Sequence, residues 1–139
     1  MTRFALIPLT LLLAGCVSSQ PIEPQLAAAS TDFSNAQRVE VSLDNFDFAP
    51  RDLQLVAGEP IELVLTNVSG GGHNLAASEF FAAAQIRPED AELVREGLLE
   101  LGGGESVSVF LIPSAGSYDT VCTHLGHGAL GMTGSITVT

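Results

Sequence analysis

The chain has 139 residues, the size of one ordinary domain, and is long enough to bury a core without help from metals or disulfides. Its formal net charge is −11, and its basic side chains are five arginines with no lysine. Because phosphate binding needs a clustered basic surface, this composition argues against a nucleic-acid partner. An acidic surface fits either simple solvation or steering toward a basic protein partner.

The first fifteen residues have the parts of a signal peptide (1–15). Arg3 supplies a small positive region, and residues 4–13 are apolar but too few to span a bilayer. The following Leu-Ala-Gly-Cys resembles the bacterial lipobox, whose cysteine, here Cys16, is lipidated and becomes the mature N-terminus. We expect an exported, lipid-anchored protein on the periplasmic face, at the outer membrane because Val17 rather than Asp follows. If the lipobox is not used, the protein is soluble in the periplasm.

Residues 16–37 are rich in Ser, Gln, Ala and Pro and have no apolar periodicity. This composition predicts a flexible tether, and about twenty such residues have a reach of roughly 25 Å. Lipidation of Cys16 also leaves Cys122 as the only other cysteine. No intramolecular disulfide is then possible in an oxidising compartment, so Cys122 needs another role.

From residue 38 to residue 139 the apolar side chains mostly alternate with polar ones, which predicts half-buried strands. The alternating positions are Val39, Val41 and Leu43, then Leu53 and Leu55, then Ile61, Leu63 and Leu65, then Val107, Val109 and Leu111, and finally Ile136 and Val138. Turns rich in Gly and Pro separate these runs. Many short strands of this kind indicate a single all-β sandwich or barrel over residues 38–139.

His73 follows three glycines at the end of a predicted strand, so we expect it on a loop at one pole of the sandwich. A lone loop histidine is usually solvated, but a downstream loop with further metal donors makes His73 a candidate ligand. Asn74 beside it is a candidate supporting residue, because its amide can tie two ligand loops together.

One stretch interrupts the strand pattern and predicts a helical crossover insertion around residues 78–101. Pro88 suits a first helical turn, and the acids at positions 89 and 90 suit the positive end of the helix dipole. Val94, Leu98 and Leu101 fall on one helical face, and three glycines follow.

The densest set of metal donors lies between residues 122 and 132. Cys122, His124, His127 and Met132 offer a thiolate, two imidazoles and a thioether, which are the soft and borderline donors that suit copper. Glycines among them give the loop freedom to curl around an ion. His124 and His127 compete for the place of the second imidazole beside His73.

Two motifs carry a resemblance to the cupredoxins, the plastocyanin and azurin family. They are Cys122-Thr-x-x-Gly126-His127-x-x-x-Gly131-Met132-x-Gly134 and Gly-His73-Asn74. The resemblance spans residues 38–139 and implies a Greek-key β-sandwich with one type-1 copper. It implies His73, Cys122 and His127 as strong equatorial ligands and Met132 as the weak axial ligand.

His124 departs from this pattern, because relatives often have an apolar residue there, followed by Pro where this chain has Leu125. It fits a solvated loop residue, a copper-entry ligand, a neighbour that titrates near neutral pH, or a replacement for His127.

Four protein ligands leave no open position for substrate, so we expect electron transfer between redox partners, such as a cytochrome or a copper enzyme, and no enzymatic activity. Three histidines in total are too few for the extra copper sites of a multicopper oxidase. The alternative is a periplasmic copper carrier or copper-tolerance protein that hands copper to copper-handling proteins. Zinc is a third option, for which a methionine is an odd donor.

Overall fold

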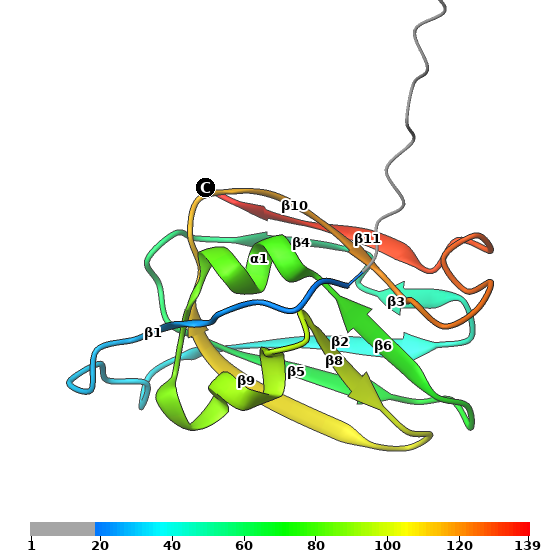
Figure 1. Cartoon of the computed structure of the whole chain (residues 1–139), viewed down its shortest axis with the longest axis horizontal. Helices are drawn as coiled ribbons and strands as arrows, with labels where there is room; N and C mark the ends of the chain where they lie inside the picture. The colour runs from blue at the N-terminus through cyan, green and yellow to red at the C-terminus, as the bar shows by residue number, and fades with distance from the viewer. Residues whose placement is uncertain (1–18) are drawn as a thin grey trace, which may run out of the picture.

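The structure is a computed structural model in which residues 19–139 are described (Figure 1). The predicted signal peptide (1–15) and the predicted lipidation site, Cys16, lie outside the described residues. Between residues 19 and 139, no helix has the length and apolar character needed to cross a membrane.

Two β-sheets pack face to face. The first sheet has six strands, in the spatial order β1 (Gln25–Leu26), β7 (Gln85–Ile86), β9 (Ser106–Ile112), β5 (Ile61–Asn67), β2 (Gln37–Asp44) and β3 (Asp47–Ala49). The second has five strands, in the order β4 (Asp52–Leu55), β11 (Thr133–Val138), β10 (Gly116–Val121), β6 (His73–Ala76) and β8 (Leu98–Leu101). Consecutive strands mostly lie in opposite sheets, so the chain repeatedly crosses between them, and the predicted β-sandwich is confirmed.

The core lies between the sheets and follows the period of two seen in the sequence. In β2, β5 and β9 the inward positions are nearly inaccessible, and they include Val41, Leu43, Leu63, Leu65, Val109 and Leu111. The facing sheet contributes Leu53, Leu55, Leu99, Leu101, Ile136 and Val138. Because every second residue of a strand points to the same face, this alternation was enough to predict the inward positions of β2, β4, β5, β9 and β11.

The crossover insertion contains less helix than predicted. It has a six-residue helix α1 (Ser78–Ala83), the short β7, a 3₁₀ helix η1 (Pro88–Val94), and then β8. Pro88 opens the second helix as expected, but the extension of helix through Leu101 was wrong. Leu98–Leu101 forms a strand because its backbone pairs antiparallel with β6, with Leu98 opposite Ala76 and Leu101 opposite His73. A periodicity of three or four residues cannot reveal such a long-range partner.

The predicted flexible tether is also wrong from residue 20 onward. Residues 20–36, here called the strap, run along the sandwich beside α1 (the blue segment in Figure 1). Gln20 donates its N–H to Ser78 Oγ at 2.8 Å, and Ile22 donates its N–H to the carbonyl of Arg95 at 2.8 Å. Further along, β1 pairs in parallel with β7, and Ala27 is only 4% exposed. Main-chain hydrogen bonds thus fix a segment whose polar composition is typical of a linker.

Candidate metal centre

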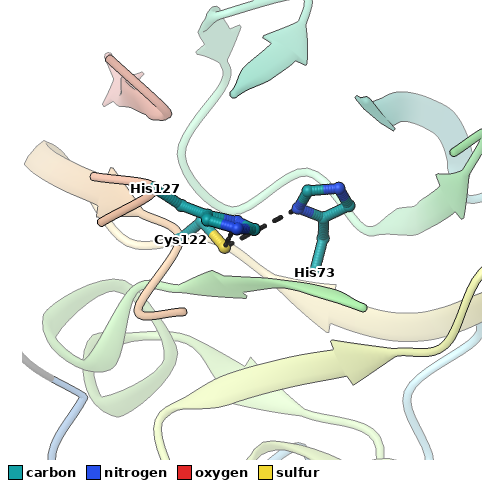
Figure 2. Close-up of side chains that lie close together, drawn as sticks. All are labelled: His73, Cys122 and His127. Carbon is teal, nitrogen blue, oxygen red and sulfur yellow. Dashed lines mark hydrogen bonds between the residues drawn. The ribbon is translucent and has the colours of Figure 1, made fainter. Parts of the chain in front are cut away.

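Three metal donors, one from β6 and two from the connection between β10 and β11, converge at one end of the sandwich (Figure 2). Cys122 Sγ lies 3.5 Å from His127 Nδ1 and 4.0 Å from His73 Nδ1. All three donor atoms lie within 4.8 Å of one another. Both imidazoles therefore direct the same ring nitrogen toward a common point next to the sulfur.

His73 is the first residue of β6 and is 1% exposed, so its expected position on a loop was wrong. The cause is again β8, since the backbone of His73 pairs with that of Leu101. Burial, followed by the nearby imidazoles of His127 and His124, lowers the pKa of His73. A lowered pKa keeps the ring neutral, and a neutral imidazole is the form that binds a metal.

Cys122 follows β10 directly and is 1% exposed. It is a free thiol and begins the ligand loop, the connection of residues 122–132 between β10 and β11. Gly126 in this loop has φ +82°, a left-handed conformation that side chains with a Cβ rarely adopt. The turn made there brings His127 back toward the sulfur.

Backbone hydrogen bonds close the ligand loop on itself. His127 donates its N–H to the carbonyl of His124, and Leu130 donates to that of Gly126, each at 3.0 Å. Met132 donates to the carbonyl of His127 at 3.0 Å. Met132 is fully buried, and its own carbonyl accepts the N–H of Cys122 at 3.0 Å. The loop thus returns Met132 to a position beside Cys122.

Asn74 joins the strand of His73 to the ligand loop, as its place next to His73 suggested. Its Oδ1 accepts the backbone N–H of Thr123 at 2.9 Å, and its Nδ2 donates to Thr123 Oγ1 at 2.9 Å. Nδ2 also donates to Glu100 Oε2 at 2.9 Å. Asn74 itself is 2% exposed, and its bonds hold two donor-bearing segments together.

His124 does not belong to the group of converging donors. Its Nε2 lies 2.7 Å from Glu100 Oε1, and since a carboxylate only accepts hydrogen bonds, this nitrogen carries the proton. The ring stacks on that of His127, with centroids 5.5 Å apart and an interplanar angle of 28°. Its side chain is 35% exposed, so His124 is more ordered than a freely solvated loop residue.

The sequence did not predict the contacts that three other residues make with the site. Glu100 on β8 bridges Asn74 and His124 through its two carboxylate oxygens. Phe46, in the turn between β2 and β3, lies edge-on to His127 with centroids 5.1 Å apart. Arg51 donates to the carbonyl of Gly131 at 3.1 Å and so fixes the end of the ligand loop. Of these three, only Phe46 had a local signal that could have been read, the turn-forming pair Asp44-Asn45 before it.

The donor set fits a copper ion. Nitrogen and sulfur donors bind first-row metals such as zinc at about 2.0–2.3 Å, so two donors of one ion lie at most about 4.5 Å apart. The separations of 3.5 and 4.0 Å from Cys122 Sγ satisfy this limit. A thiolate with two imidazoles, and a thioether available nearby, suits copper better than zinc.

The fold and this donor set together define a cupredoxin, a β-sandwich that holds copper at one end. The sequence profile of the copper-binding proteins of the plastocyanin/azurin family matches residues 35–139, and the chain belongs to that family. The cofactor of the site is one type-1 copper ion.

The chain is similar to auracyanins. Auracyanin-B of Chloroflexus aurantiacus is 33% identical over 124 residues, which cover 75% of this chain. The chain spans about half of that relative's length, 53%. A solved auracyanin B structure superposes with a TM-score of 0.57 at 26% identity, covering 88% of this chain and 99% of the other. A solved structure of auracyanin A, a blue copper protein of Chloroflexus aurantiacus, superposes with a TM-score of 0.51 at 21% identity. It covers 73% of this chain and 99% of the other.

Proposed function

We propose that the protein is a type-1 blue copper protein that carries single electrons between redox partners. His73, Cys122 and His127 are the equatorial ligands, and Met132 is the weak axial ligand. The observation that carries this proposal is the buried sulfur of Cys122 with an Nδ1 atom of each imidazole within 4.0 Å. Bound copper supplies a one-electron couple between its two oxidation states.

The residues of the chain favour rapid electron exchange by limiting movement. His73 is fixed by strand pairing to β8, and Cys122 directly follows β10. The ligand loop carries its own hydrogen bonds, and Asn74 links it to β6. Donors held in this way change position little when the charge of the site changes, and the burial of Cys122 excludes water. Four protein ligands leave no open coordination position on the metal for a substrate, so the proposed role is that of a carrier and not of an enzyme.

Electrons enter and leave through His127, the half-buried ligand. Phe46, which lies against its ring, is 42% exposed, and Leu130 is 66% exposed. Leu75, which follows His73 and Asn74 in the sequence, is 2% exposed and belongs to the core, not to this surface. Small apolar surfaces of this kind suit brief encounters with a redox protein.

The site of action is outside the cytoplasm, with the protein attached to the periplasmic face of a membrane by a lipid on Cys16. The lipobox-like Leu-Ala-Gly-Cys and the single remaining cysteine support this part of the proposal.

The deciding experiment measures the reduction potential of the copper-loaded protein together with its rate of electron exchange with a cytochrome. Fast exchange supports the electron carrier. Slow exchange combined with very tight retention of Cu(I) would support the copper-carrier alternative. The engagement of His124 by Glu100 argues against that alternative, because this extra imidazole is held by a carboxylate and not left available to pass copper on.

A further inference from the structure

The strap determines where the polypeptide leaves the domain. Its first hydrogen bond joins Gln20 to Ser78, and the next joins Ile22 to Arg95. Gln25 adds a bond from its Nε2 to the carbonyl of Ala82 at 2.7 Å, and Phe33 packs edge-on against Phe110. Because these attachments begin at residue 20, the strap cannot act as the slack part of a tether.

Ser19, the residue directly before the strap, lies beside the ligand loop. Ser19 lines an open cleft of about 450 Å³ together with residues of the ligand loop, among them Cys122, His124 and Leu125. Figure 1 has the start of the blue segment on the side of the molecule where β10 and β11 are joined. The exit point and the metal centre therefore share one end of the sandwich.

Only three residue steps separate Ser19 from Cys16. An extended chain advances at most about 3.6 Å per residue, so three residue steps reach at most about 11 Å in any conformation. A tether of about twenty residues would have had a reach of roughly 25 Å and would have left the orientation of the domain free.

We propose that the lipid anchor holds the bilayer surface close to Ser19, on the side of the domain that carries the cleft of the ligand loop. This inference rests on the lipid anchor at Cys16 proposed above. The fully exposed side chain of Leu125, with a relative exposure of 101%, lines the same cleft and suits the apolar side of a lipid interface. Electron exchange is then confined to a thin layer next to the membrane.

Lipid charge does not drive this placement, because the chain has a formal net charge of −11 and is repelled by anionic headgroups. The short covalent connection drives it. The apposition is therefore expected on zwitterionic phosphatidylcholine bilayers, and the test uses them.

The test uses the full lipidated, copper-loaded protein on phosphatidylcholine vesicles that contain a headgroup dye whose emission overlaps the visible thiolate-to-copper band. Only the oxidised site absorbs there, so quenching that disappears on reduction measures how close the copper is to the headgroups. The matched variant carries a Gly/Ser insertion of about 20 residues between Ser18 and Ser19, which adds a reach of roughly 25 Å.

We expect strong reversible quenching in the native chain and a several-fold loss of quenching in the insertion variant. Equal quenching in the two proteins, with both bound to vesicles, would overturn the inference. If the protein retains its visible band but does not bind vesicles, the lipid anchor is absent and the inference is overturned. Vesicle-bound protein without the visible band would instead reject the proposed copper function, while a dye-labelled version of the same protein still reports its distance from the bilayer.

Discussion

The strap and the ligand loop meet at one end of the molecule, but different forces hold them in place. The ligand loop depends on side-chain donors at fixed spacings, Cys122, His127 and Met132, closed by its own backbone bonds. The strap depends on main-chain hydrogen bonds to β7 and to Arg95 after η1, and on bonds to α1 that use the side chains of Ser78 and Gln25. Ala27 is its deepest side chain. The loop therefore sets the chemistry of the protein, and the strap sets where that chemistry takes place. The two should respond independently to mutation.

The largest effect is expected from Cys122→Ser. Serine has nearly the same shape, but its hydroxyl is not a thiolate at neutral pH, so the variant should lose the intense visible thiolate-to-copper band completely. Absorption spectroscopy of the Cu(II)-loaded protein measures this. Limited proteolysis of the copper-free variant is the control, and the strap should stay as protected as in the native protein. A band that persists in the variant would contradict Cys122 as a ligand.

A second comparison lies within the ligand loop itself, between His127→Ala and His124→Ala. His127→Ala removes an equatorial ligand and should also remove the visible band. Removing a residue that only supports a ligand typically weakens metal binding about 10–100-fold, and the loss in His127→Ala should be larger. The loss of copper affinity in His124→Ala should be no larger than about 100-fold, and the visible band should remain, because His124 contacts Glu100 and not Cys122. Competition with a chelator measures both affinities. Equal losses in the two variants would refute the choice of His127.

A third variant tests the strap alone. Ala27→Glu places a charge where the native side chain is 4% exposed, so the strap should detach and the free energy of unfolding should fall by about 2 kcal/mol. Urea denaturation measures this change, and the visible band should remain as in the native protein. The exposed Ala29→Glu is the matched control and should change stability by less than about 0.5 kcal/mol. A loss of colour with Ala27→Glu would mean that the two regions are coupled.

The smallest effect is expected from Glu100→Gln, which removes a negative charge that lies beside Asn74 and His124. Less negative charge near the site destabilises Cu(II) relative to Cu(I), so the reduction potential should rise. The side chain is 52% exposed, so the effect should be about 1 kcal/mol or less, or at most about 40 mV for one electron. Voltammetry measures the shift. Glu59→Gln, in the turn between β4 and β5, is the control, and an equal shift there would rule out a local effect.

Part of the fold was predictable because its signals are local. Alternation such as Val39, Val41 and Leu43 identified strands and the buried face, since side chains alternate along any strand. In β6 and β8 this signal was absent or misleading, because the strand character of Leu98–Leu101 comes from pairing with His73–Ala76. The strap was missed for the same reason, since a partner such as Ser78 for Gln20 is 58 residues away.

The sequence by itself determined the donor chemistry, because thiolate, imidazole and thioether groups keep their preference for copper wherever the chain takes them. Their spacing after Cys122 was enough to suggest the class of protein. Tertiary structure alone decided that His73 is the first residue of a strand, that Glu100 is hydrogen-bonded to His124, and that the strap begins beside the ligand loop. These facts depend on contacts between residues distant in the chain, and the physical preferences of single residues or short segments do not encode such contacts.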